Sequence, residues 1–209
     1  MTNEEITKGI LINYSARISK QRPFIVAFDG LSGVGKTTLV HRIDRELRNN
    51  GCKVVIIHID DHIVERNKRY DTGYEEWYEY YYLQWDVNLL STDLFRKLHN
   101  NKNDLILPFY NHSEDTLTLK KISIPNDSII LIEGIFLLRK EWRSFYDYTI
   151  FLDCPRDVRY ERVLKRDSYI GDYQERLNKY KRRYWPGEGY YLEGDNPIGL
   201  ADLVIDSIE

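Results

Sequence analysis

Five short apolar runs alternate along the chain with longer segments in which apolar residues recur every three or four positions. The runs are rich in β-branched residues and cover residues 24–28, 54–59, 129–132, 149–152 and 203–205. Continuous apolar runs of this length are typical of parallel strands that are buried on both faces. Because helical segments separate them, they predict an α/β fold: a doubly wound, mostly parallel five-stranded sheet with helices on both faces.

Two helices are predicted near the N-terminus. The first lies within residues 3–20, where apolar residues recur at spacings of three and four: Ile6, Ile10, Leu11, Tyr14 and Ile18. The second follows the first apolar run, and its apolar stripe is formed by Leu39, Val40, Ile43 and Leu47. Gly51 marks the end of this second helix, because glycine readily takes the conformation that closes a helix.

The middle of the chain departs from simple alternation. Residues 75–98 predict one long helix or two short ones that are broken near Trp85 and Asp86. Within residues 105–124 apolar and polar positions alternate, which predicts an excursion that contains a β-hairpin. A strongly charged helical region follows over residues 157–184.

A glycine-rich turn joins the first apolar run to the second helix. Residues 30–37 read Gly-Leu-Ser-Gly-Val-Gly-Lys-Thr, the pattern G-x-x-x-x-G-K-[ST] between a buried strand and a helix. Its glycines let backbone N–H groups close around an anion, and the positive end of the helix strengthens the binding. The pattern predicts a P-loop with these nucleotide-binding residues: Gly30, Leu31, Ser32, Gly33, Val34, Gly35, Lys36, Thr37 and Thr38.

Two side chains of the P-loop have separate expected roles. Lys36 would reach the β and γ phosphates, and the Thr37 hydroxyl would coordinate a Mg²⁺ ion that bridges them. Thr38 is the weaker candidate and reads as a helix residue. A flexible Gly/Ser turn is the structural alternative, but the flanking strand and helix favour a nucleoside triphosphate site, with ATP as co-substrate and Mg²⁺ as cofactor.

Composition narrows the class of partner. The 209 residues carry a formal net charge of −3, so they lack the basic field that nucleic-acid binding requires. Cys52 and Cys154 have no metal or redox spacing, which suits a reducing cytoplasm. No apolar run approaches the roughly 20 residues that span a bilayer. We therefore expect a cytoplasmic protein with a small-molecule substrate and neither nucleic acid nor membrane as partner, and a homo-oligomer stays open.

Carboxylates follow two of the predicted strands. Asp60 and Asp61 come directly after residues 54–59, and Glu133 comes directly after residues 129–132. Ligands of doubly wound sheets bind beyond the carboxyl ends of the strands. One carboxylate there could accept the proton of an attacking hydroxyl, and another could hold Mg²⁺. A turn or helix cap is the alternative for the aspartates, and a plain strand-end residue is the alternative for Glu133.

Arginines recur on one face of the charged helical region. Arg159, Arg162 and Arg166 are three and four residues apart. A solvated charged face is the usual explanation of such a row, but few acids interleave here. We favour a helical lid that closes over the polyphosphate, balances the charge of the transition state and excludes water.

Taken in order, these motifs resemble those of the uridine kinase and phosphoribulokinase-like family of P-loop kinases. The resemblance runs from about Phe24 to Ile205. The matching segments are the phosphate loop at 30–38, the strand-end Asp motif at 60–63, the acceptor segment at 84–90, the Glu-Gly segment at 132–135, the lid at 159–167 and a closing Pro and Ala-Asp pattern within 180–205.

The resemblance implies a P-loop NTPase fold and one P-loop kinase domain over residues 1–209. Its parts are an N-terminal helix at 1–20, an acceptor-site excursion at 84–124 and a lid region at 156–184. The implied catalytic residues are Asp60 as the base, Lys36, Arg162 and Arg166. The implied acceptor-binding residues are Asp60, Asp86, Tyr110 and His112, and the implied metal site consists of Thr37, Glu133 and Asp60.

The acceptor segment departs from the family pattern. Uridine kinases commonly carry Tyr-Asp-Phe followed by a His and an Arg, whereas here Asn111 follows Tyr110, His112 comes early and the Arg is missing. We predict an ATP- and Mg²⁺-dependent kinase that phosphorylates a primary hydroxyl, with uridine or cytidine as the leading acceptor. The alternatives are another acceptor, such as nicotinamide riboside or pantothenate, or a P-loop nucleotide-binding regulatory or ATPase protein. Asp61 stays open as an alternative base.

Overall fold

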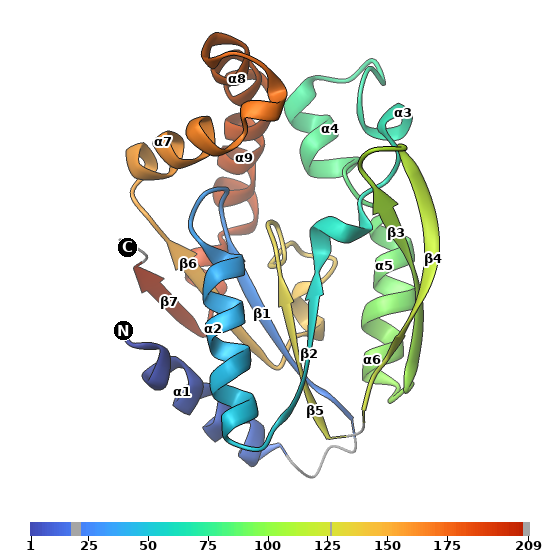
Figure 1. Ribbon diagram of the computed structural model, residues 1–209, viewed down its shortest axis with the longest axis vertical. Helices are drawn as coiled ribbons and strands as arrows, with labels where there is room; N and C mark the ends of the chain where they lie inside the picture. The colour runs from blue at the N-terminus through green and yellow to red at the C-terminus, as the bar shows by residue number, and fades with distance from the viewer. Residues whose placement is uncertain (18–21, 126, 207–209) are drawn as a thin grey trace.

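A five-stranded parallel sheet lies at the centre of the structure, a computed structural model that describes residues 1–17, 22–125 and 127–206 (Figure 1). The strand order is β2-β5-β1-β6-β7, and every pairing is parallel. The strands are β1 (Phe24–Gly30), β2 (Lys53–His58), β5 (Ser128–Glu133), β6 (Tyr148–Asp153) and β7 (Leu203–Asp206). The predicted fold class is therefore confirmed, because each predicted apolar run forms one of these strands.

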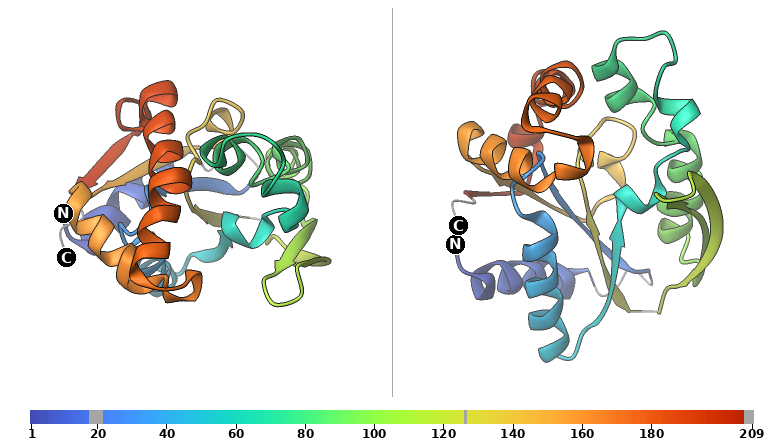
Figure 2. Two further views of the ribbon diagram at one scale, coloured as in Figure 1. Left: turned by 90° about the horizontal axis from the view of Figure 1, so that it is seen from above. Right: turned by 45° about the horizontal axis from the view of Figure 1, so that its top comes forward.

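The central strands form the core of the molecule. Every residue of β1 and of β5 is buried, as expected for strands that are covered on both faces. Helix α2 (Lys36–Asn49) packs against β1, β2 and β5, and α1 (Asn3–Ala16) packs against α2. Figures 1 and 2 show α1 and α2 side by side.

Local sequence signals explain where several helices begin and end. The Thr2 hydroxyl caps α1 in a reciprocal arrangement with Glu5. Helix α2 ends before Gly51, whose φ of 81° suits glycine. The predicted N-terminal helix extended to residue 20, whereas α1 ends at Ala16, and residues 18–21 lie outside the described residues.

The predicted break near Trp85 is confirmed. Helix α4 (Glu76–Tyr82) precedes it, and after it α5 (Val87–Leu90), a π-helical segment (Ser91–Arg96) and α6 (Lys97–His99) continue one another. A short helix, α3 (Arg66–Arg69), lies upstream of α4.

The predicted hairpin is also confirmed, and it forms a separate two-stranded sheet. Strand β3 (Asp104–Asn111) pairs antiparallel with β4 (Thr116–Ser123). In Figure 1 the hairpin lies outside the main sheet, beside α5 and α6.

The charged helical region forms a sequence of helices above the carboxyl ends of the strands (Figure 1). It begins with α7 (Arg156–Arg166) and α8 (Tyr173–Lys179). A π-helical segment (Tyr180–Tyr184) then leads into α9 (Trp185–Asp195), which is followed by α10 (Pro197–Leu200). None of the described helices combines the length and the apolar composition needed to cross a membrane.

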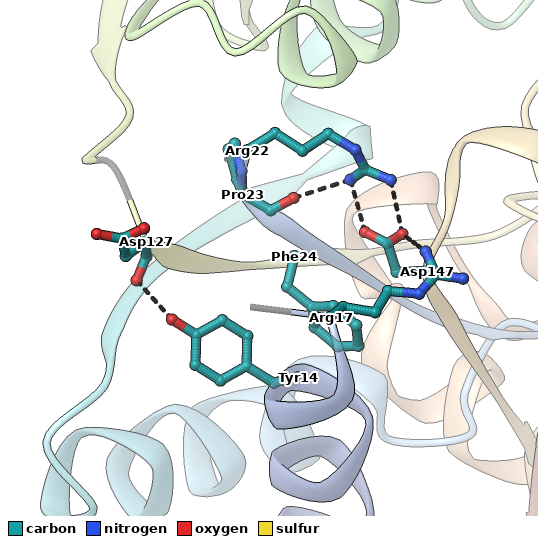
Figure 3. A pocket seen from close by; sticks show the side chains of 7 residues that line it. All are labelled: Tyr14, Arg17, Arg22, Pro23, Phe24, Asp127 and Asp147. Atoms are coloured by element: carbon teal, nitrogen blue, oxygen red, sulfur yellow. Dashed lines mark hydrogen bonds and ion pairs between the residues drawn. The ribbon is translucent and has the colours of Figure 1, made fainter. Parts of the chain in front are cut away.

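A cluster of charges closes the opposite end of the sheet (Figure 3). The Asp147 carboxylate, directly before β6, accepts two hydrogen bonds of 2.7 Å from Arg22 and a further one from Arg17. It also accepts the backbone N–H of Ile25 at 2.9 Å. Arg17 follows α1, so this cluster ties the N-terminal helix to β1 and β6.

Candidate active site

The P-loop joins β1 to α2 and has the backbone geometry that its glycines permit. Gly33 and Gly35 have φ angles of 81° and 94°, a region that residues with a Cβ rarely occupy. Gly33 is also enclosed, because a Cβ there would lie 2.9 Å from the Arg159 carbonyl oxygen and 2.8 Å from Val163 Cγ1. Glycine is therefore required at this position both by the turn and by the contact with α7.

A cavity of about 650 Å³ opens beside the P-loop. Many predicted site residues line it: Ser32, Gly33, Gly35, Lys36, Thr37, Thr38, Asp60, Glu133, Arg162 and Arg166. Three lining residues were missed by the sequence reasoning: Tyr80, Ile135 and Lys165. The cavity thus brings together side chains from the P-loop, β5, α4, α7 and the turn after β2.

Lys36 and Thr37 already have partners within the site. Lys36 Nζ donates to the carbonyl oxygens of Gly30 at 2.7 Å and of Leu31 at 3.1 Å. The Thr37 hydroxyl donates to Glu133 Oε1 at 3.1 Å. The hydroxyl and the carboxylate that were predicted to hold Mg²⁺ therefore meet directly, and Mg²⁺ prefers such oxygen ligands.

Glu133 lies between Thr37 and a histidine. His58 Nδ1, at the end of β2, is 2.6 Å from Glu133 Oε1. Burial acts to raise the pKa of Glu133, but the hydrogen bond from His58 and the charge of Lys36 outweigh it and hold that pKa below its usual value. The same hydrogen bond raises the pKa of His58. Glu133 is therefore ionised at neutral pH.

Asp60 lies in a single helical turn, residues 59–62, that follows β2. Its carboxylate lines the cavity and is exposed to solvent there, although the protein atoms packed around it remove part of its hydration. This desolvation, together with the charges of Glu133 and Asp61, raises the pKa of Asp60 to about 6, although Lys36 and Arg166 oppose the shift. The result is a carboxylate that is a stronger base than usual and is still mostly ionised at pH 7. Asp61 is exposed and is not among the lining residues.

The predicted row of arginines is divided by the structure. Arg162 and Arg166 line the cavity together with Lys165. Arg162 Nη1 lies 3.4 Å from the Gly33 carbonyl oxygen, and Arg166 Nε pairs with Asp167 at 2.6 Å. The expectation that Arg159 joins this row was wrong, because its guanidinium is buried against Glu188.

The other predicted acceptor residues have partners outside this cavity. Asp86 caps α5 by accepting the N–H of Leu89 at 2.9 Å. The Tyr110 hydroxyl, on β3, donates to Asp115 at 2.8 Å, and the His112 ring packs edge-on against the Tyr110 ring. None of the three lines the cavity beside the P-loop. Their acceptor-binding role stays a prediction.

Tyr80 adds a hydroxyl that sequence reasoning missed. It belongs to the tyrosine-rich α4 and is buried, with its side chain on the cavity wall. Burial and the nearby Glu188 and Asp60 raise the pKa of Tyr80, so its hydroxyl stays protonated and can donate a hydrogen bond. A dense run of tyrosines reads as packing, so its pattern carries no signal that singles out Tyr80.

A parallel sheet of this order, with a P-loop sequence after its central strand and carboxylates at the ends of two other strands, is the arrangement of P-loop nucleotide-binding proteins. Residues 25–176 match the Phosphoribulokinase / Uridine kinase family model, and the chain belongs to this family. It is therefore a phosphotransferase of the kinase class, for which family and fold imply ATP as co-substrate and Mg²⁺ as its ion.

Individual relatives agree with this assignment. The chain is 31% identical over 195 residues to the uridine kinase of Borrelia duttonii. The aligned region covers 87% of this chain and 85% of the relative. It is 29% identical over 153 residues to the uridine kinase of Lactobacillus helveticus, covering 70% and 69% of the two chains.

Solved structures give the same result. The structure of a possible uridine kinase from Bacillus stearothermophilus is 42% identical, with a TM-score of 0.77 and coverage of 97% of this chain and all of the other. The D-glycerate 3-kinase of Cryptococcus neoformans is 13% identical with a TM-score of 0.66, covering 91% and 87% of the two chains, and shares the fold.

Proposed function

We propose that the protein transfers the γ-phosphoryl group of ATP to a primary hydroxyl of a nucleoside, with uridine and cytidine as the leading acceptors. One observation carries the proposal: the Asp60 carboxylate shares a cavity with the P-loop and has a pKa raised to about 6. A base at the mouth of a phosphate site is what in-line transfer to a hydroxyl requires. The similarity to uridine kinases supports the nucleoside as acceptor.

In this mechanism the P-loop and α7 hold the donor. Backbone N–H groups of the loop bind the phosphates, and Lys36 leaves the carbonyl oxygens of the loop to reach the β and γ phosphates. Arg162, Lys165 and Arg166 of α7 line the same cavity, where their charge balances that of the transferring group.

The acceptor and a Mg²⁺ ion would bind next to the carboxylates that line the cavity. Asp60 orients the acceptor hydroxyl and takes its proton, and the Tyr80 hydroxyl is available to donate a hydrogen bond to the acceptor. Thr37 and Glu133, with Asp60, would hold Mg²⁺, which when bound neutralises phosphate charge.

A different observation favours another hydroxylated metabolite as acceptor, such as nicotinamide riboside or pantothenate. The two groups that the family resemblance assigns to a nucleoside are already engaged, since Asp86 caps α5 and the Tyr110 hydroxyl donates to Asp115. A ribose would have to bind through the remaining lone pairs of these two groups, whereas an acceptor without a ribose, such as pantothenate, would not use them.

The test is ADP release with a panel of acceptors. Uridine, cytidine, nicotinamide riboside and pantothenate are each supplied with MgATP, and mass spectrometry identifies the phosphorylated product. We expect stimulation by uridine or cytidine, with the phosphate on the primary hydroxyl. If only nicotinamide riboside or pantothenate stimulates ADP release, that compound would replace uridine and cytidine as the proposed acceptor. Steady ATP hydrolysis that no acceptor changes would favour a regulatory or ATPase protein.

A further inference from the structure

A buried ion pair binds the backbone N–H and the backbone carbonyl of one P-loop residue, Ser32. Glu188, near the start of α9, accepts the backbone N–H of Ser32 at 2.9 Å through Oε1. Arg159, on α7, donates to the carbonyl oxygen of Ser32 at 3.2 Å. The two side chains are joined at 3.0 Å and are only 3% and 7% exposed. Both backbone polar groups of Ser32 are thus bound by two side chains that also bind each other.

Two close contacts beside this pair hold α7 against the P-loop and α9 against α4. The Arg159 backbone touches Gly33 so closely that no Cβ would fit, and Arg159 Nε donates to the Cys154 carbonyl oxygen at 3.3 Å. On α9, Gly187 lets the helix approach Tyr80, because a Cβ at position 187 would lie 2.9 Å from the Tyr80 ring. The ion pair therefore connects the P-loop to two helices that are themselves fixed.

We propose that Glu188 and Arg159 are positioning residues that hold the P-loop in its phosphate-binding form before ATP arrives. The inference rests on the proposed function, since it takes the P-loop to be the triphosphate site. A glycine-rich loop is costly to order, and a loop that is ordered in advance binds its ligand without that cost. In consequence the start of α7 stays docked on the P-loop, and any closure over the phosphates involves segments beyond it.

Because Glu188 and Arg159 carry opposite charges, we expect their removal to affect ATP binding to different extents. Glu188 on its own would place a buried negative charge next to Ser32, a residue that lines the proposed phosphate site, and Arg159 neutralises it. Removal of one partner of a buried pair leaves an uncompensated charge, which costs more than removal of both. Loss of Arg159 should therefore weaken ATP binding more than loss of Glu188, and removing Glu188 as well should recover part of that loss.

The test measures ATP affinity by titration calorimetry for wild type, Glu188→Ala, Arg159→Met and the double variant. For Glu188→Ala we expect the Kd for ATP to rise about tenfold, the effect of one charge-assisted hydrogen bond, with the KM for the acceptor within about twofold. Arg159→Met should bind ATP more weakly still, and the double variant should bind better than Arg159→Met. Glu188→Gln, which keeps an oxygen for the Ser32 N–H, should lose less affinity than Glu188→Ala.

Asp147→Asn is the matched control, because it disrupts a buried ion pair at the far end of the sheet. It should lower the thermal midpoint and leave the Kd for ATP unchanged. If Glu188→Ala also loses stability only, or if the double variant shows additive losses, the positioning role is overturned. A wild-type protein that binds no ATP would instead overturn the proposed function, and this inference with it.

Discussion

The two ends of the central sheet use similar side chains in opposite ways. At the amino ends of the strands, Arg17 and Arg22 share the Asp147 carboxylate, which is 1% exposed and also accepts a backbone N–H. At the carboxyl ends, Lys36 and Asp60 face a cavity of about 650 Å³, and the pKa of Asp60 is raised to about 6. Charges whose hydrogen bonds are complete stabilise a fold, whereas charges around an open cavity are available to a ligand.

The largest effect on activity is expected at Asp60. Asp60→Asn keeps the size of the side chain but removes the base, so kcat should fall about 10²- to 10⁴-fold. The KM for ATP should stay near that of wild type, because the P-loop is untouched and Thr37 and Glu133 remain to hold Mg²⁺. Steady-state kinetics with the preferred acceptor measures both constants. An unchanged kcat would move the base to Asp61 or eliminate it, and Asp61→Asn is the matched comparison.

The second largest effect on activity is expected for Lys36→Ala. It should reduce kcat/KM for ATP about 10²- to 10³-fold, the usual result of removing one group that stabilises transition-state charge. Unlike Asp60→Asn, this variant should also bind ATP more weakly in a direct titration. The acceptor affinity measured without ATP should be unchanged. Unaltered ATP binding would remove Lys36 from the donor site.

The pH dependence of kcat/KM for the acceptor tests the same carboxylate without a substitution. Asp60 is active as a base only when ionised, so activity should rise with pH and level off above a midpoint near 6. At pH 5 we expect about one tenth of the plateau value, by the ratio of protonated to ionised carboxyl. A flat profile between pH 5 and 8 would contradict the raised pKa.

The raised pKa of Asp60 also lowers the stability of the folded protein at neutral pH. The folded-state pKa of Asp60 lies above its unfolded value, so the fold favours the protonated form, and this contribution is lost as the pH rises toward 6. Asp60→Asn should therefore raise the thermal midpoint at pH 7.5 relative to wild type and change it little at pH 4. Scanning calorimetry at the two pH values measures the difference, and a lower midpoint at pH 7.5 would contradict it.

The sequence predicted those parts of the site that are formed by residues close together in the chain. The P-loop could be identified because glycines, lysine and threonine stand together between a strand and a helix, and Asp60 and Glu133 because each directly follows a strand. The strand runs likewise predicted the sheet, although their order in it comes from tertiary packing.

Contacts between distant segments could not be predicted in this way. Ser32 and Glu188 are 156 residues apart, and no local pattern marks Glu188 as a partner of the P-loop. Arg159 and Arg162 share a helix face in sequence, yet in the structure the first is buried against Glu188 and the second lines the cavity. An Asp directly before a helical segment is a common helix cap, which is the role that Asp86 has in the structure. The family resemblance instead assigned Asp86 to acceptor binding.

The smallest effect on activity is expected from the far end of the sheet. Asp147→Asn leaves an amide that can still accept the Ile25 N–H, but Arg17 and Arg22 lose their shared carboxylate. We expect a loss of about 2 kcal/mol of unfolding free energy, because partly exposed Arg17 is screened by water and only Arg22 is largely buried. For a chain of this length that loss lowers the thermal midpoint by about 4–8 °C. Below the transition, kcat and the KM for ATP should match wild type. A variant with normal stability and impaired kinetics would instead couple the two ends of the sheet, and the contrast between a structural end and a chemical end would no longer hold.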